Sequence, residues 1–235
     1  MKVEDLRNIA IVAHVDHGKT TLVSELLWQS GVQSDEKSTH LLDSNALEKE
    51  RGITILAKNT ALIWKGVKIN LVDTPGHADF SGEIERILSM VDSVLVLVDA
   101  VEGPMPQTRF VTEMALSNGL SPIVVINKCD RPAARPSWVL DKTFDLFEQL
   151  GATDSQLDFL TVYCSATEGY ARLDPFHKNE DMTCLLDGIL ENVSPPHVEK
   201  GPFQMQISAL DHSDYVGTIG IGKVVRGELE KGTRV

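Results

Sequence analysis

The chain has 235 residues, of which 42% are hydrophobic, and its formal net charge is −12 at pH 7. This length fits one large domain, or a domain with part of another, and the composition can supply a sizeable core. The acidic balance argues against a freestanding, non-specific nucleic-acid binder, although docking on a nucleoprotein through a local basic face stays compatible with it.

The first predicted element is a strand over 8–12, followed by a loop at 13–21 and a helix that begins near Leu22. The loop reads AHVDHGKTT. Backbone N–H groups that converge in such a loop, together with the positive end of the helix dipole, form a phosphate-binding site. In it Lys19 supplies a charge for the outer phosphates, and the Thr20 hydroxyl is placed to ligate Mg²⁺.

Residues 32–51 lack hydrophobic periodicity and are rich in charge. They are expected to form either a solvated surface loop or a switch that orders on ligand binding, and their position after the phosphate-loop helix favours the switch. Two strands follow at 59–64 and 67–72, and Lys65-Gly66 between them is typical of a tight hairpin turn.

Strands and helices then alternate along the chain. The expected elements are a helix at about 79–91, a strand at 93–99, a helix at 106–117, a strand at 122–126, a helix that begins near Pro136, a strand at 159–163, a polar excursion at about 167–181 and a helix near 183–193. This alternation predicts an α/β fold with a doubly wound, mostly parallel sheet. Because ligands bind at the carboxyl ends of such strands, the loops after residues 12, 72, 126 and 163 are expected to converge on one site.

The segment SPPH at 194–197 predicts a domain boundary, which divides the chain into 1–198 and 199–235. Strand-like runs at 203–210 and 217–225 favour the start of a β-barrel domain. Two strands cannot close a barrel or bury its face, so the chain is expected to be a fragment of a longer protein.

Two further stretches carry residues suited to a metal-bound triphosphate. Asp73, at a strand end, can hold Mg²⁺ through its water shell, and the Gly76 N–H can bond a γ-phosphate. Thr54 can offer its hydroxyl to Mg²⁺ and its backbone N–H to the same phosphate. Taken alone, the first stretch could be a plain turn after a strand, and the second the start of a strand.

Base selection is expected in the sequence NKCD, which follows a predicted strand. The Asp130 carboxylate can accept from the ring N–H and the exocyclic amino group of guanine, a pair of donors that adenine does not present there. Lys128 can lay its stem along the base, and Asn127 can tie adjacent loops together. Ser165-Ala166 would add a backbone N–H to the guanine carbonyl oxygen.

Together these stretches resemble the five signature loops of a translational GTPase. The amino-acid sequence at 43–60, 99–110 and 201–208 resembles that of the BipA/TypA family, and the resemblance covers essentially the whole chain. Ala13, where most phosphate loops have Gly, is usual in that family. The resemblance implies a P-loop GTPase domain in an N-terminal fragment that lacks the family's remaining domains, including its ribosome-reading C-terminal part.

The resemblance also implies roles for single residues. His77 would orient the attacking water when the enzyme is docked on the ribosome, and a packed polar residue in a turn is the alternative. The phosphate-loop residues expected to bind nucleotide are Asp16, His17, Gly18, Lys19, Thr20 and Thr21. Asp16 would also hold the loop or a monovalent cation. No Arg can be named as a finger in cis, so hydrolysis is expected to be slow without a partner.

The resulting hypothesis is a Mg²⁺-dependent, ribosome-associated GTPase switch in translation or ribosome assembly. Its ligands would be GTP and GDP, and its partners, for the full-length protein, rRNA and ribosomal proteins. Residues 32–58 and 73–80 would order with GTP and be released by hydrolysis. The alternatives are an ATP-using phosphotransferase on the same loop and a nucleotide-gated binding module without efficient hydrolysis.

The cysteines and the hydropathy pattern indicate where such a protein works. Three widely spaced cysteines without a C-x-x-C pair argue for a reducing compartment and against a disulfide frame or a zinc site. No segment has the pattern of a signal peptide or of a membrane span. A soluble, cytoplasmic and monomeric fragment without membrane contact is therefore expected.

Overall fold

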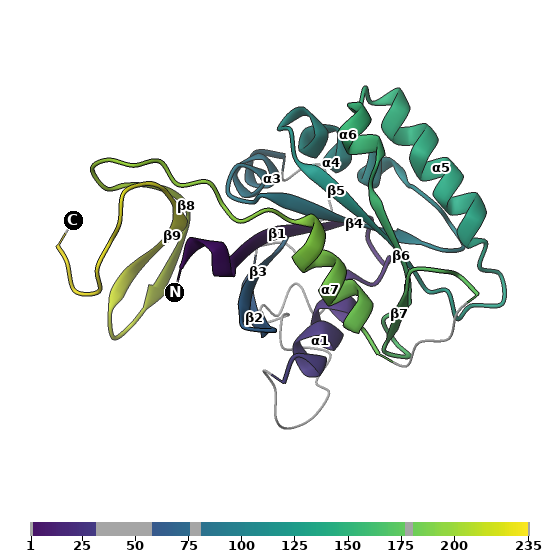
Figure 1. The fold of residues 1–235 in the computed structure, drawn as a ribbon, viewed down its shortest axis with the longest axis horizontal. Coiled ribbons are helices and arrows are strands. Elements are labelled where there is room, and N and C mark those ends of the chain that lie inside the picture. Colours follow the sequence, from purple (N-terminus) through teal and green to yellow (C-terminus); the bar gives the residue numbers. More distant parts are fainter. Residues whose placement is uncertain (1, 32–57, 76–80, 177–180, 235) are drawn as a thin grey trace.

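The main body of the molecule is a sheet of seven strands in the computed structural model, which describes residues 2–31, 58–75, 81–176 and 181–234 (Figure 1). Across the sheet the strands are β2 (Lys58–Trp64), β3 (Val67–Asp73), β1 (Leu6–Ala13), β4 (Ser93–Asp99), β5 (Ser121–Asn127), β6 (Leu160–Ser165) and β7 (Tyr170–Arg172). β3, β1, β4, β5 and β6 run parallel, whereas β2 and β7 pair antiparallel at the two edges. The predicted α/β fold with a mostly parallel sheet is confirmed.

Helices cover both faces of this sheet. One face carries α1 (Lys19–Gln29) and α7 (Thr183–Asn192), and the other carries α3 (Ser81–Leu88), α4 (Pro106–Ser117) and α5 (Pro136–Gln149). Two short helices, η1 (Val3–Asp5) and α6 (Asp154–Leu157), precede β1 and follow α5. In the part of the chain that the structure describes, no helix is long and apolar enough to cross a membrane.

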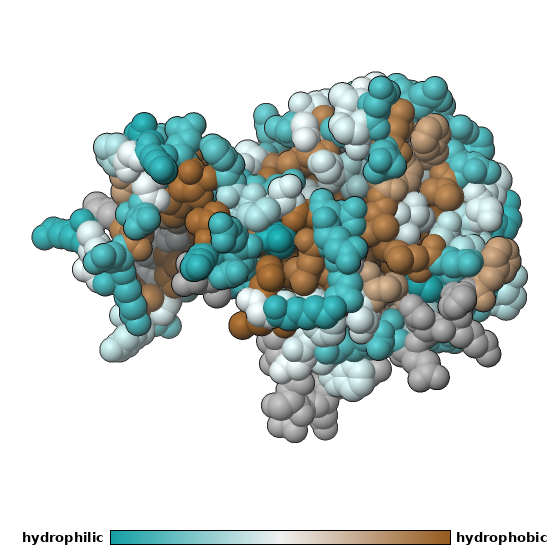
Figure 2. All heavy atoms as spheres, in the orientation of Figure 1, coloured by the Kyte–Doolittle hydropathy of each residue, from teal (hydrophilic) through white to brown (hydrophobic). Residues whose placement is uncertain are grey.

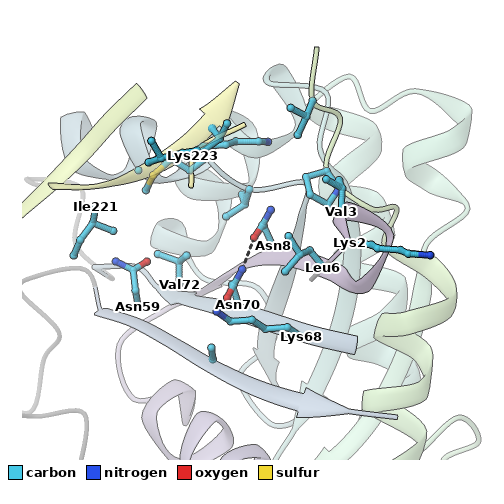
Figure 3. A pocket seen from close by; sticks show the side chains of 18 of the residues that line it. Lys2, Val3, Leu6, Asn8, Asn59, Lys68, Asn70, Val72, Ile221 and Lys223 are labelled. Carbon is cyan, nitrogen blue, oxygen red and sulfur yellow. Dashed lines mark hydrogen bonds between the residues drawn. The ribbon is translucent and has the colours of Figure 1, made fainter. Parts of the chain in front are cut away.

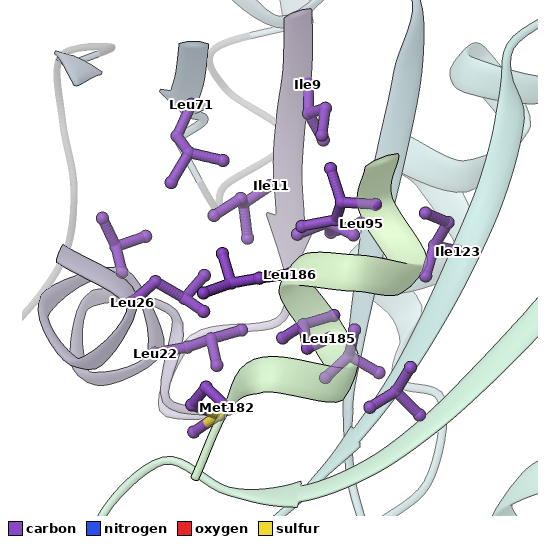
Figure 4. Close-up of a cluster of buried hydrophobic side chains, with 14 of the residues drawn as sticks. Ile9, Ile11, Leu22, Leu26, Leu71, Leu95, Ile123, Met182, Leu185 and Leu186 are labelled. Atoms are coloured by element: carbon purple, nitrogen blue, oxygen red, sulfur yellow. The ribbon is translucent and has the colours of Figure 1, made fainter. Parts of the chain in front are cut away.

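The inner strands are buried on both sides because their residues alternate between two apolar clusters. In β1, Ile9 and Ile11 join the cluster under α1 and α7, whereas Ala10 and Val12 join the cluster under α3, α4 and α5. Figure 4 shows the first cluster, in which Leu22 of α1 lies near the side chains of α7. β4 is buried along its whole length, as its continuous apolar run predicts. These clusters hold the strand ends that form the site.

The differences from the sequence-based boundaries are local. The helix expected at about 79–91 is α3, which ends at Leu88, and its expected first two residues lie outside the described part of the chain. The polar excursion at 167–181 contains β7, which was not predicted because three residues are too short to show a period. The turn between β2 and β3 has the expected left-handed backbone, with φ of 48° at Lys65 and 84° at Gly66.

A separate antiparallel pair follows the main sheet, formed by β8 (Gln204–Ser213) and β9 (Gly217–Arg226). None of its described residues is buried, and Ile207 is 50% and Leu210 72% exposed. Figure 2 shows hydrophobic surface on this lobe. Both predicted strands of the second region are therefore present, and their assignment to a separate barrel domain from residue 199 stays a prediction.

A chain of polar side chains links the main sheet to this hairpin. The Asn70 amide donates to Asn8 Oδ1 at 2.7 Å, and the Asn8 amide donates to Asp92 Oδ2 at 2.8 Å. Lys223 of β9 completes the chain with its Nζ 2.8 Å from Asp92 Oδ1. Figure 3 shows Asn8, Asn70 and Lys223 on the wall of a cavity of about 1190 Å³ between the two sheets. Asp92 thus holds groups from both sheets at once.

Replacing Asp92 with Ala should lower the free energy of unfolding by about 2 kcal/mol, because the Asn8 amide and the Lys223 ammonium both lose their acceptor in a partly buried place. Urea denaturation at pH 7 measures this loss. The matched control is Asp145→Ala, whose carboxylate pairs at 2.8 Å with Lys142 on the surface, where both side chains are 49% exposed. That change should leave the free energy of unfolding nearly unchanged, since exposed pairs contribute little, and equal losses in the two variants would contradict the linking role of Asp92.

Candidate functional site

The loops that follow β1, β3, β4 and β5 leave the same edge of the sheet. The parallel register pairs Ile11 of β1 with Asp73 of β3, and Ala13 of β1 with Leu97 of β4. It also pairs Asp99 with Asn127 at the ends of β4 and β5. β1 lies between β3 and β4, and the helix after β1 covers one face of the sheet whereas the helices after β3 and β4 cover the other. Ligands bind outside the carboxyl ends of strands at such a point, so the loop after β1 is the expected place for a ligand.

The loop between β1 and α1 has the backbone of an anion-binding turn. Asp16 and Gly18 have φ of 65° and 92°, both in the left-handed region. Gly18 caps α1, and its carbonyl accepts the Leu22 N–H at 2.9 Å, so the helix begins at Lys19 with its amino end toward the loop. Thr20 and Thr21 stand in this first turn and are partly exposed. The first N–H groups of a helix have no partner within the helix, so the amino end of α1 and its dipole face the loop.

Lys19 lies beside the carboxylate expected to hold the metal. Its Nζ is 3.1 Å from Asp73 Oδ1, and both side chains are buried, at 9% and 3% exposure. The same ammonium donates to the Thr74 carbonyl, and the Thr74 hydroxyl donates to the Ile11 carbonyl at 2.8 Å. The ends of β1 and β3 are therefore held together directly beneath the loop. A buried lysine and a buried carboxylate neutralise each other here.

Asn127 joins three loops through one buried amide. Its Nδ2 donates to the His17 carbonyl at 2.9 Å, and its Oδ1 accepts the Ala166 N–H at 3.0 Å. The Cys164 thiol lies 3.4 Å from the same oxygen. We call this set of contacts the Asn127 bridge. It fixes the loop after β1 against the segments that follow β5 and β6.

The Asn127 bridge explains why position 18 requires glycine. A Cβ on Gly18 would lie 2.5 Å from Asn127 Nδ2, closer than real Cβ atoms approach a neighbour. The left-handed φ of Gly18 adds backbone strain for any residue with a side chain. Both the close approach and the backbone therefore exclude a larger residue here.

Lys128 spans from the end of β5 to the loop after β1. Its Nζ donates to the Asp16 carbonyl and lies 2.6 Å from Asp99 Oδ2. Burial alone would raise the pKa of Asp99, but the Lys128 ammonium and the Val101 N–H together hold that pKa below its ordinary value. From the sequence, Asp99 is the end of a predicted strand and the first residue of the stretch 99–110 that resembles the family, with no role of its own. The feature of the sequence that could have indicated a role for Asp99 is its position as an acid at the end of an otherwise apolar, buried strand.

The remaining base-pocket candidates lie around the same edge. The Asp130 side chain is exposed, whereas Ser165 and Ala166 are buried. The Ser165 hydroxyl accepts the Glu168 N–H at 3.2 Å. The Ala166 N–H, expected to face a guanine carbonyl, donates to Asn127 in this structure, so such a role requires that it share or release this bond.

The side chain of His17 turns away from the loop into the protein. Its Nδ1 lies 3.4 Å from the Leu97 carbonyl, and its Nε2 lies 3.4 Å from a carboxylate oxygen of Glu102. Burial lowers the pKa of this imidazole below its ordinary value. The His17 side chain is therefore held inside the protein, turned away from a ligand in the loop.

Several expected site residues cannot be placed. Thr54, Gly76 and His77 lie outside the described residues, as do nearly all of the expected switch at 32–58 and most of the one at 73–80. Of the expected metal-binding residues, Thr20 and Asp73 are described. No group of three or more His, Cys, Asp or Glu among the described residues forms a metal cluster by itself.

Residues 4–195 match the family model of the elongation factor Tu GTP binding domain. The chain is 62% identical over 232 residues to the large ribosomal subunit assembly factor BipA of Haemophilus influenzae, covering 97% of this chain and 38% of that protein. Identity to BipA of Escherichia coli K12 is also 62%, over 99% of this chain and 39% of that protein. The chain thus spans about two fifths of the length of these relatives, and the resemblance to the BipA/TypA family is confirmed.

Among solved structures, a bacterial selenocysteine-specific elongation factor EF-Sec is similar with a TM-score of 0.72 and 24% sequence identity. The match covers 96% of this chain and 35% of that one. At this identity the likeness concerns the fold alone. It agrees with the arrangement of strand ends described above.

Replacing Gly18 with Ala should weaken binding of a fluorescent GDP analogue by about 10- to 100-fold, because backbone strain of ~1–3 kcal/mol combines with displacement of Asn127. Gly31→Ala is the matched control. Gly31 also has a left-handed φ, of 75°, but nothing lies within 4 Å of the added Cβ. The control should lose about 1 kcal/mol of stability and no affinity, and native affinity in Gly18→Ala would refute the proposed close approach.

Proposed function

Because the chain belongs to the family of the elongation factor Tu GTP binding domain, we propose that it binds guanine nucleotides with Mg²⁺ and hydrolyses GTP. The observation that carries this proposal is the Asn127 bridge, which sets the phosphate-binding loop at a fixed place against the segment NKCD. The phosphates and the base of a nucleotide are joined covalently through the ribose, so a link that holds the two loops at one separation suits such a ligand.

The phosphates would lie over the loop after β1. Lys19 would exchange part of its contact with Asp73 for the outer phosphates, since a point charge beneath the loop favours them. Mg²⁺ is held in such sites by phosphates, waters and one or two protein oxygens, a pattern that Thr20 and Asp73 fit, with Thr54 as a further proposed ligand. The bound ion would neutralise charge on the phosphates during transfer.

The base would lie along Lys128, with Asp130 as the acceptor that selects guanine and Ser165-Ala166 at the carbonyl edge. The Asp130 side chain is exposed and therefore accessible to a base, which supports this placement. An ATP-using phosphotransferase is not favoured, because the donors that Asp130 reads are missing from adenine. Asp16 is proposed as a support of the loop, through the carbonyl that Lys128 contacts, or as a site for a monovalent cation.

For catalysis we propose that His77 orients the attacking water and that the Gly76 N–H bonds the γ-phosphate. Residues 32–58 and 73–80 would serve as the nucleotide-responsive switches. Because the relatives are large ribosomal subunit assembly factors by name, the proposed setting is a ribosome-binding, cytoplasmic GTPase that contacts rRNA and ribosomal proteins. Hydrolysis would be slow until the ribosome completes the site.

Single-turnover hydrolysis with the full-length protein tests this function. Ribosomes should accelerate GTP cleavage by about a thousandfold or more, and His77→Ala should abolish the acceleration while GTP binding is retained. His197→Ala is the matched control, since His197 is exposed on the connection after α7, and it should keep the native rate. The absence of both stimulation and a His77 effect would favour a nucleotide-gated binding module instead.

A further inference from the structure

Asp99 is a fully buried acid to which neither the motifs nor the proposed function assigns a task. Its exposed fraction is 0%, at the end of a strand whose other residues form a continuous buried run. Oδ1 accepts the Val101 N–H at 2.7 Å, which closes the turn after β4. The second oxygen faces Lys128 at 2.6 Å, so the carboxylate does more than cap its own turn.

Lys128 depends on partners to keep one conformation. Its backbone has a left-handed φ of 65°, and its side chain is only 17% exposed although it is long and flexible. The ammonium is held between Asp99 and the Asp16 carbonyl. Arg131 does not replace it, since its Nη1 is 3.7 Å from Asp99 Oδ2 and its side chain is 49% exposed. Asp99 therefore supplies the charge that keeps Lys128 in place.

We infer that Asp99 is a positioning residue for the guanine base, acting through Lys128. Asp99 holds the Lys128 ammonium against the Asp16 carbonyl, and this directs the aliphatic part of the Lys128 side chain across the place of the base. The same contact ties Lys128 to the phosphate-binding loop. An ordered side chain costs less conformational entropy when the ligand binds. This inference rests on the proposed guanine-nucleotide site and adds a residue that controls how long the nucleotide stays.

A double-mutant cycle on the dissociation of a fluorescent GDP analogue tests the inference in the full chain. Asp99→Asn keeps an oxygen for the Val101 N–H but removes the charge that faces Lys128. It should speed GDP dissociation by about tenfold in the native background. In a Lys128→Met background, which keeps the stem and lacks the ammonium, the same change should alter the rate by less than about twofold.

Control variants separate this role from a general loss of structure. Glu113→Gln removes an exposed carboxylate on α4 and should leave dissociation unchanged. Arg131→Gln should change it by less than about twofold, since that pair is long and half exposed. If Asp99→Asn does not fold, Asp99→Ser, which also keeps an oxygen near Val101, takes its place in the cycle.

The outcomes are distinct. A tenfold effect that disappears in the Lys128→Met background supports the inference. Equal acceleration in both backgrounds would show that Asp99 only shapes its own turn, and native dissociation in Asp99→Asn would show that it does not act at all; either result overturns the inference alone. If the native chain binds no GDP, the proposed function fails, and the inference fails with it.

Discussion

The Asn127 bridge is the contact on which the rest of the site depends. One buried amide holds the His17 carbonyl on one side and the Ala166 N–H on the other, so three loops share a single fixed point. A buried polar group without a partner is costly, so the loss of one of these hydrogen bonds should destabilise the whole arrangement. Two ion pairs accompany it: Lys19 pairs with Asp73, and Lys128 pairs with Asp99.

The sheet makes the Asn127 bridge possible. Parallel pairing in a register that sets Ile11 opposite Asp73 and Asp99 opposite Asn127 brings polar residues from distant parts of the chain to one edge. The apolar clusters on both faces hold the strands so that these ends do not slide. The hairpin β8–β9 is attached differently, through the polar chain that ends at Lys223. The proposed ligand contacts thus rest on the main sheet and its two apolar clusters.

Much of this arrangement could be predicted from the sequence, because local patterns of residues encode it. The continuous apolar run of β4 and the NKCD segment after β5 have clear signatures, and Asn127 indeed lies between adjacent loops. β7 was missed because three residues carry no period, and its place depends on β6 beside it. The pairing of Asp99 with Lys128 was missed because it depends on strand register and on a left-handed backbone at Lys128, neither of which a local pattern encodes.

We propose that the Asn127 bridge sets a phosphate-binding loop against a pocket that selects guanine. Competition of GDP and ADP for a bound fluorescent GDP analogue on the purified chain measures this selection. A site that pairs Asp130 with the guanine donors should require at least about a thousandfold more ADP than GDP for equal displacement. Displacement by ADP at the same concentration as GDP, or at a lower one, would show that the pocket does not select guanine.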